Sequence, residues 1–405
     1  MKILVLRSSF QTDEFVEKEY APLLNLLRTD CRAEILILGD EDDAINKLKA
    51  NDLVPDIVMT ATGGVENLFT RITPALKKDV RIIADGRNNS LAAALEILSY
   101  LRNNGRKGTI VHGSVDEIVA SVKAMKNPLA GMRIARFGKP SDWLIASDVD
   151  TEILLKRYGV ETVDVDLQSL IHRVAEMPQT EAVKVARDIV SRAKLNKEPS
   201  CADMVEAAKV YLAIKEICAE NGVNALTIRC FDIVKSCRTT SCLALALLND
   251  EGVIAGCEGD MQSLLTMVLA KKLCGENAFM ANPSLLTDTT SSFAHCTIPF
   301  SMCDEVVLRS HFESSLGVAL QGHLPEDVYT ILKWGGECLD KYFVAEAVAA
   351  KMPYSEHYCR TQITLNINMK PYLLNKTIGN HHVIVRGRHA DAVRAFMAEN
   401  GVEEV

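Results

Sequence analysis

The chain begins with a regular alternation of short apolar runs and longer amphipathic segments. Aliphatic and β-branched residues dominate five runs: KILVLRSS from residue 2, AEILIL from 33, DIVMTA from 56, VRIIAD from 80 and GTIVHG from 108. Between them, apolar residues recur at helical spacing, most clearly over 91–101 and 115–125. Buried strands that alternate with helices are typical of a parallel sheet with helices on both faces. We therefore predict a doubly wound α/β domain over residues 1–130.

The turns of this first series are candidates for ligand contacts. Gly63-Gly64 follows the third strand-like run, and residues 86–89 follow the fourth. Open α/β sheets bind ligands at the carboxyl ends of their strands, which is where both turns fall. The series contains no GxGxxG motif, so a dinucleotide is not indicated.

A second strand-and-helix series follows a polar break at 126–131 that contains Pro128 and Gly131. The strand-like runs are MRIARFG, VETVDVD, ALTIRCF and VIAGCEGD. Helical segments are expected over 153–158, 181–197, 202–221, 241–248 and 261–273. This pattern predicts a second doubly wound parallel-sheet domain over residues 131–280.

The amino-acid composition changes after about residue 280. Thr, Ser, Val and aromatic residues become more frequent there, and turns come closer together. The segments VVLRSHFESSLGVALQGHL, YTILKWGG, YCRTQITLNIN and HHVIVRGR are typical of antiparallel strands. A short helix over 390–400 closes the chain. We predict a β-rich, barrel-like domain over residues 281–405.

Composition narrows the classes of partner. The chain has 405 residues, a formal net charge of −8 and no block of Lys and Arg, which argues against nucleic acid or an anionic membrane as its partner. No apolar run approaches the roughly 18 to 20 residues of a membrane span, and the N-terminus is typical of a first strand rather than a secretion signal. The 12 cysteines show no CxxC pair. Free buried thiols in a reducing compartment explain them best, so we expect a cytoplasmic protein.

The sequence EGVIAGCEGD, residues 251–260, contains the strongest chemical signal. Glu258 and Asp260 follow an apolar strand, and burying an unpartnered carboxylate costs several kcal/mol or more. We therefore expect a cation, a sugar or an arginine to face them. An alternative for Asp260 is that it caps the helix that begins near Met261.

Histidines provide the second signal. Seven of the nine lie from His295 onward, and His381 and His382 are adjacent. Neighbouring residues of a strand point to opposite faces, so one of this pair can serve a site while the other does not. Glu258, Asp260 and one of these imidazoles would form a cation site that suits Mn²⁺ or Mg²⁺.

Three further side chains are weaker candidates for substrate binding. Trp143 could stack on the apolar face of a sugar or cover a domain edge, and Arg360 could bind substrate or form an ion pair within its strand. Arg238 could also meet a charged substrate.

The segments CEGDMQSLLTMVLAKKL, FMANPSLLTD, FAHC and GNHHVIVRG resemble the superfamily of L-fucose isomerase and L-arabinose isomerase. The resemblance implies two α/β domains and a β-rich domain, and a divalent metal, usually Mn²⁺, held by two carboxylates and a C-terminal histidine. A carboxylate then moves a proton between C1 and C2 of the sugar through an ene-diol. Glu258 matches the first carboxylate, and His381 or His382 matches the histidine. His295 resembles an additional histidine of the arabinose enzymes, and we expect it to contact the substrate.

The chain departs from this pattern at the second carboxylate, where Ala281 or Asn282 stands. An asparagine can offer its carbonyl oxygen to a metal, but it cannot accept a proton at neutral pH. We therefore expect Asp260 or Asp288 to act as the base. The resemblance also implies a homo-oligomer, a trimer or a hexamer, with sites between subunits and with Arg87 and Asn88 near the end of the sugar.

Three functions follow from this combination. The first is a metal-dependent aldose–ketose isomerase acting on a sugar or sugar derivative. The second is an isomerase of an anionic sugar that uses Arg238 or Arg360 against the charge. The third is a non-catalytic sugar-binding protein, which the missing acid at Asn282 favours and the retained Glu258 and histidine pair disfavour.

Overall fold

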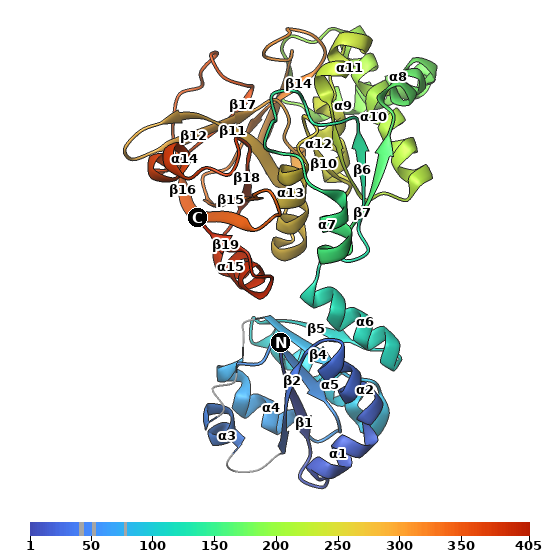
Figure 1. Cartoon of the computed structure of the whole chain (residues 1–405), viewed down its shortest axis with the longest axis vertical. Coiled ribbons are helices and arrows are strands. Elements are labelled where there is room, and N and C mark those ends of the chain that lie inside the picture. The colour runs from blue at the N-terminus through green and yellow to red at the C-terminus, as the bar shows by residue number, and fades with distance from the viewer. Residues whose placement is uncertain (40–43, 51–53, 77–78) are drawn as a thin grey trace. The chain divides into compact units, whose positions relative to one another are not determined.

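The structure is a computed structural model that describes residues 1–39, 44–50, 54–76 and 79–405 (Figure 1). The chain divides into two compact units, Met1–Asn127 and Pro128–Val405. The predicted boundary near residue 280 falls inside the second unit and stays a prediction. Among the described residues, no helix combines the length with the apolar character that a membrane span needs.

The first unit is a parallel five-stranded sheet in the order β2-β1-β3-β4-β5. Its strands are β1 (Lys2–Arg7), β2 (Glu34–Gly39), β3 (Ile57–Thr60), β4 (Asp79–Ile83) and β5 (Lys107–Val111). One face packs on α1 (Asp13–Glu19), α2 (Ala21–Thr29) and α6 (Val115–Lys126). The other face packs on α3 (Ala44–Ala50), α4 (Glu66–Ile72) and α5 (Ser90–Asn103). The apolar strands therefore lie between two helical layers, as the sequence predicts.

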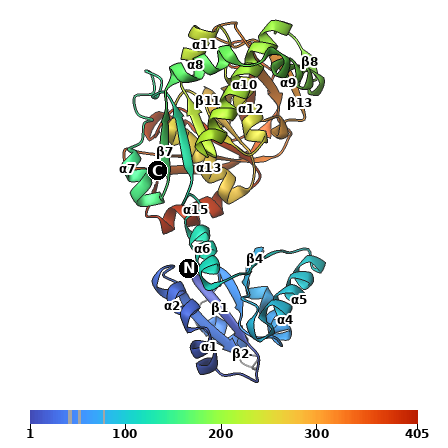
Figure 2. The same cartoon turned by 90° about the vertical axis from the view of Figure 1, so that its right-hand side faces the viewer.

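The second unit begins with a parallel four-stranded sheet in the order β10-β9-β6-β7. The strands are β6 (Arg133–Phe137), β7 (Glu161–Val165), β9 (Ala225–Ile228) and β10 (Ile254–Gly256). The helices are α7 (Thr151–Ile153) with a π-helical turn at Leu154–Tyr158, α8 (Leu167–Glu176), α9 (Gln179–Arg192), α10 (Cys201–Asn221), α11 (Cys230–Cys237), α12 (Cys242–Asp250) and α13 (Met261–Cys274). Figure 2 shows α8, α9 and α10 packed together.

The C-terminal part closes into a ring of six antiparallel strands in the order β15-β18-β11-β12-β17-β16, with β16 pairing back to β15. Its strands are β11 (Ala278–Leu286), β12 (Ser291–His295), β15 (Val328–Gly335), β16 (Lys341–Ala350), β17 (Thr361–Leu365) and β18 (His382–Arg386). Closure leaves few free strand edges and confirms the barrel-like prediction. The remaining elements are β13 (Glu305–Arg309), β14 (Ala319–His323), α14 (Lys370–Asn375), α15 (Ala390–Glu399) and β19 (Glu403–Glu404).

Helix α13 joins the two sheets of the second unit. It packs on β10 from the parallel sheet and on β15 and β18 from the barrel (Figure 1). Its first ten residues, 261–270, are all buried, which fits a helix covered on every side. The N-terminus of this central helix therefore lies where the parallel sheet meets the barrel.

Two local predictions are wrong, and three strands of the barrel were missed. The helix expected to reach residue 197 ends at Arg192, because Leu195–Asn196 forms β8 and pairs with β13. The strand expected over 225–231 ends at Ile228, and Cys230 already begins α11. Strands β11, β12 and β16 of the barrel were not predicted. In each case pairing or packing with distant residues overrides the local pattern. All twelve cysteines are free thiols, and six of them are buried.

Candidate functional site

A tight turn after β10 presents Glu258. Its backbone is left-handed, with φ of 62°, a conformation that costs free energy for a residue other than glycine. Gly259 follows with φ of 75°, and a Cβ there would lie 2.7 Å from Cα of Pro140. The N–H of Ser141 donates to the Glu258 carbonyl over 2.9 Å. The turn is therefore held against the loop after β6, and it fixes the direction of the Glu258 side chain.

The Glu258 carboxylate faces two imidazoles. Its Oε1 lies 3.6 Å from Nε2 of His295, at the end of β12, and 3.6 Å from Nε2 of His381, just before β18. The indole N–H of Trp143 donates to Oε2 over 2.7 Å, which leaves Oε1 directed at the histidines. Ligand atoms of the three residues lie within 4.8 Å of one another, all buried, and they could hold a metal ion.

Asp260 orients one of these imidazoles. Its Oδ2 lies 3.0 Å from Nδ1 of His381. A carboxylate can only accept, so Nδ1 carries the hydrogen and the lone pair of a neutral imidazole is on Nε2, toward Glu258. Asp260 is also the N-cap of α13, because it accepts from the Ser263 N–H over 2.7 Å. Asp260 therefore caps α13, which was one of the two predictions for it, and it also orients His381, which the sequence did not predict.

The charged groups of this cluster shift one another's pKa values. Burial alone would raise the pKa of Asp260, but Lys333, 3.8 Å away, and the hydrogen bonds from His381 and Ser263 lower it to about 2. Burial raises the pKa of Glu258, and the facing imidazoles outweigh this and hold it well below its usual range. Burial lowers the pKa of His381, but hydrogen bonding and charge from Asp260 and Glu258 raise it to about 9. The two carboxylates are therefore ionised at neutral pH. In the metal-free protein the His381 imidazole is positively charged, with a hydrogen on Nε2 as well as on Nδ1.

This protonation predicts how divalent metal binding depends on pH. A metal ion that binds to Nε2 of His381 would have to displace the proton on this nitrogen. The pKa of the His381 imidazole is about 9. We expect affinity for Mn²⁺ to rise about tenfold per pH unit between pH 6.5 and 8.5 and to level off above pH 9, as release of one proton requires. Calorimetric titration in buffers of different ionisation enthalpy measures both the affinity and the proton released. An affinity that is constant across this range would contradict the assignment of His381 as a ligand.

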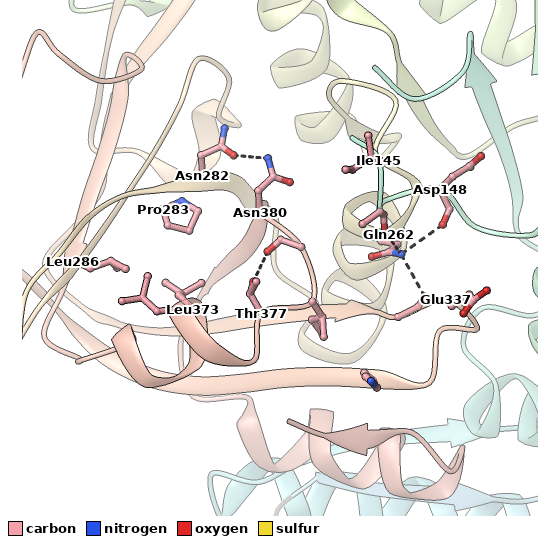
Figure 3. A pocket seen from close by; sticks show the side chains of 16 residues that line it. Ile145, Asp148, Gln262, Asn282, Pro283, Leu286, Glu337, Leu373, Thr377 and Asn380 are labelled. Atoms are coloured by element: carbon pink, nitrogen blue, oxygen red, sulfur yellow. Dashed lines mark hydrogen bonds between the residues drawn. The ribbon is translucent and has the colours of Figure 1, made fainter. Parts of the chain in front are cut away.

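Two spaces near the cluster share Asn282 as a lining residue. Glu258 and His295 line a small cavity of about 40 Å³, together with Asn282, His311 and Glu313. Asn282 also lines an open cleft of about 950 Å³. In Figure 3, Asn282, Pro283 and Asn380 lie along one wall of this cleft, with Ile145 and Gln262 across from them. Asn282 Oδ1 accepts from Asn380 Nδ2 over 3.0 Å, and Asn380 lines the open cleft as well.

The other predicted residues of the second unit lie as follows. His382 is buried away from the carboxylates, 3.0 Å from the Tyr372 hydroxyl, and burial lowers its pKa to about 3. Asp288 is exposed and pairs with Lys370 over 2.8 Å. Arg360 donates to Glu356 over 3.0 Å and to the Ser310 carbonyl over 2.9 Å. Arg238 is exposed at the end of α11.

Two predicted residues belong to the first unit. Arg87 pairs with Asp85 over 2.6 Å and with Glu19 over 3.1 Å, and its guanidinium lies over the Tyr20 ring. Asn88 donates to the Tyr20 hydroxyl over 3.3 Å. Both side chains are therefore engaged within that unit, and their predicted contact with substrate stays a prediction.

The sequence did not indicate His311 and Glu313, a histidine and a carboxyl group that line the small cavity. Both come from the loop between β13 and β14. Burial lowers the pKa of His311 to about 4, so this imidazole is neutral. Burial and the Glu258 charge raise the pKa of Glu313. Their loop has no motif that links it to residue 258, and only the folded barrel brings them to the cavity.

Fold and site together define an α/β protein with a C-terminal barrel and a buried cluster of one carboxylate and two imidazoles suited to a metal ion. A comparison with protein-family models finds no match. Curated proteins similar to this chain are named sulfoquinovose isomerase. They include those of Alkalicoccus urumqiensis (24% identical over 289 residues, 62% of this chain and 63% of the relative), Clostridium sp. strain MSTE9 (26% over 224 residues, 52% and 50%) and Priestia megaterium (24% over 202 residues, 47% and 45%). The chain thus spans between 45% and 63% of the length of these relatives.

Proposed function

We propose that this protein is a metal-dependent aldose–ketose isomerase. The observation that carries the proposal is the convergence of the buried Glu258, His295 and His381 beside a small cavity that shares Asn282 with an open cleft. The similarity to proteins named sulfoquinovose isomerase supports the reaction class. The resemblance of the CEGD and HH segments to sugar isomerases supports it independently.

The buried donor atoms fit a divalent cation. Among the residues that the structure describes, Nε2 of His381 is buried and has no partner at hydrogen-bond distance, with the Glu258 carboxylate at 3.6 Å, and a buried polar atom without a close partner is costly. A cation bound between Glu258, His295 and His381 would satisfy it. Two imidazoles favour Mn²⁺ over Mg²⁺, because Mg²⁺ prefers oxygen ligands. Asn282 lies beside the cluster and offers an amide oxygen.

The chemistry divides among the residues around the cavity. A bound divalent ion would polarise the sugar carbonyl and acidify the adjacent C–H and O–H groups. Asp260 accepts two hydrogen bonds from Ser263 and faces Lys333, so we assign it to holding His381 rather than to moving a proton. Exposed Asp288, paired with Lys370, is not needed in this scheme.

Glu313 is the carboxyl best placed to replace the missing acid at Asn282. It lines the same small cavity as Glu258 and His295, and it also reaches solvent. Its raised pKa brings it nearer to neutral pH, where a carboxylate is a more effective proton acceptor. We propose that Glu313 accepts the C2 proton and returns it to C1.

This role predicts a large loss in turnover without loss of metal. Glu313→Gln should lower kcat by about 10²- to 10⁴-fold, the usual contribution of a general base. Metal content should stay at the wild-type level, because Glu313 is not among the three ligand candidates. Glu276→Gln, an exposed carboxylate outside the cavity, is the matched control and should leave kcat unchanged. Full turnover in the Glu313 variant would remove this residue from the mechanism.

The cleft favours a neutral sugar. Its charged lining residues are Asp148, Glu337 and Lys341, so its own charge is slightly negative. Amides at Gln262, Asn282 and Asn380 suit sugar hydroxyls. The names of the relatives support the second candidate, an anionic sugar such as sulfoquinovose. We further propose that the protein forms a homo-oligomer with sites between its subunits. We also propose that it is located in the cytoplasm.

Hydrogen exchange at C2 tests the function directly. Neutral aldoses, carboxylated aldoses and sulfoquinovose are each incubated with the Mn²⁺-loaded protein in D₂O, and NMR follows deuterium at C2. The proposal predicts exchange and ketose formation for at least one of them, with loss of both when the metal is chelated. Saturable sugar binding without exchange for every sugar would instead establish the non-catalytic alternative.

A further inference from the structure

The small cavity beside Glu258 is lined by five cysteines, all of them free thiols. They come from the starts of α11 and α12, the ends of β10 and β12 and the loop before β17, and they are Cys230, Cys242, Cys257, Cys296 and Cys359. Buried cysteine often serves as a small apolar residue. The proposed isomerase chemistry uses none of these thiols, so their arrangement around one cavity needs a separate explanation.

Two of these sulfur atoms are in direct contact. Sγ of Cys257 lies 3.2 Å from Sγ of Cys230, and the Cys257 S–H donates to the Cys230 sulfur. Both side chains are buried, with 6% of Cys230 and 3% of Cys257 exposed. The sulfur atoms of a disulfide are about 2.05 Å apart, so a bond between this pair requires an approach of only about 1 Å.

The two thiols differ in their surroundings. Cys230 is the first residue of α11, and the N-terminus of a helix favours negative charge. Reactive cysteines often lie at this position, because the thiolate is the nucleophilic form. The S–H of Cys257 donates to the same sulfur, which also favours negative charge there. We therefore assign Cys230 as the attacking sulfur and Cys257 as its partner.

The cavity selects the kind of oxidant that can reach this pair. Its volume is about 40 Å³, and a single water molecule needs a cavity of about 10–15 Å³. The space therefore accommodates hydrogen peroxide, which has two oxygen atoms, but not a peptide disulfide. Glu258 and Glu313 line the same cavity and disfavour an anionic oxidant such as glutathione disulfide. A small, uncharged hydroperoxide fits both requirements.

We propose that Cys230 and Cys257 form an oxidisable dithiol, which hydrogen peroxide converts to a disulfide. The Cys230 sulfur attacks one peroxide oxygen, the O–O bond breaks, and a sulfenic acid and one water form. The Cys257 sulfur then attacks the sulfenic sulfur, the S–O bond breaks, and the hydroxide leaves as a second water with the Cys257 proton. The two thiols lose two electrons and two protons, and both peroxide oxygens end in water.

The disulfide would also move the Glu258 carboxylate. Cys257 directly precedes Glu258, and Phe231, the second residue of α11, packs edge-on against Trp143 with ring centroids 4.8 Å apart. Trp143 in turn donates to the Glu258 carboxylate. Drawing the start of α11 toward the turn after β10 therefore shifts this carboxylate relative to the two imidazoles. The resulting loss of metal affinity rests on the proposed metal site, whereas the disulfide itself does not.

Peroxide treatment of the full-length, metal-free protein tests the proposal. Catalase removes the peroxide, the remaining thiols are alkylated, and mass spectrometry of a digest identifies linked peptides. We expect a Cys230–Cys257 link that dithiothreitol reverses, and no such link after treatment with glutathione disulfide. Calorimetric affinity for Mn²⁺ should fall by about 10- to 100-fold after peroxide, the usual effect of disturbing groups that orient a ligand, and should return after reduction.

Two variants make the result specific. Cys230→Ser should form no link, and peroxide should leave its affinity for Mn²⁺ unchanged. Cys201→Ser is the matched control, because Cys201 also begins a helix, α10, but is exposed and outside the cavity. It should form the link as the wild type does.

Three results on the wild-type protein would overturn the proposal, and none of them requires a variant to fold. They are the absence of a Cys230–Cys257 link, a link between Cys296 and Cys359 in its place, and a link that leaves the affinity for Mn²⁺ unchanged. Failure of the reduced protein to bind Mn²⁺ would instead contradict the proposed metal site, and the linked peptide would still decide whether the dithiol is oxidised.

Discussion

Glu258→Gln is expected to lose bound divalent metal and to lower the rate of C2 exchange by about 10²- to 10⁴-fold or more. Glutamine keeps the size of the side chain, and its amide oxygen can still accept from the Trp143 indole, which lies 2.7 Å from the wild-type carboxylate. The change therefore removes one negative charge with little change in shape. His295 and His381 would remain as the two imidazole ligands, without the anionic oxygen that pairs with a cation.

Metal analysis and exchange kinetics on the same preparation check this result. Glu337→Gln is the matched control, because Glu337 lines the cleft but is not part of the ligand cluster. It should retain the wild-type metal content. A Glu258 variant with full metal content and full exchange would show that the cluster is only a buried ion pair.

Asp260→Asn is expected to reduce both the stability of the fold and the affinity for metal. Lys333 is fully buried, and its ammonium lies 3.8 Å from Asp260 and 2.9 Å from the Ser263 hydroxyl. Removing one partner of a buried pair leaves an uncompensated charge and typically costs about 3–5 kcal/mol. Loss of the carboxylate that orients His381 should lower metal affinity by about 10- to 100-fold. Urea unfolding of the metal-free protein and Mn²⁺ titration measure the two effects.

A second substitution separates these two roles. Lys333→Met in the Asp260→Asn background removes the stranded ammonium, so most of the lost stability should return. Metal affinity should stay low, because His381 still lacks its carboxylate. If Asp260→Asn alone unfolds at the wild-type urea concentration, the buried pair does not stabilise the fold as described. If Lys333→Met restores metal affinity as well, Asp260 does not act through His381.

The sequence predicts most of the fold because many strands of the sheets have a recognisable pattern of apolar residues. Strands buried on both faces appear as continuous apolar runs, which located β1 to β5. β16 was missed because its apolar and polar residues alternate weakly and its pairing with β15 and β17 is set by the barrel. The short strand β8 was missed because it exists only through its partner β13.

The candidate site is predicted only in part for the same reason. Two carboxylates after a buried strand indicated Glu258 and Asp260, since their burial requires partners. The choice between His381 and His382 depends on the register of β18 against β11 and β15, which the sequence does not state. His295 was predicted to touch substrate, whereas the structure brings it to Glu258. Glu313 reaches the cavity from a loop without any motif.

Anomalous diffraction from crystals soaked in Mn²⁺ tests the central claim most directly. Data collected at the manganese absorption edge locate the ion without reference to activity or to the choice of sugar. The account predicts one strong peak coordinated by Oε1 of Glu258, Nε2 of His295 and Nε2 of His381. A fully soaked crystal with no peak there, or with its strongest peak on other ligands, would contradict it.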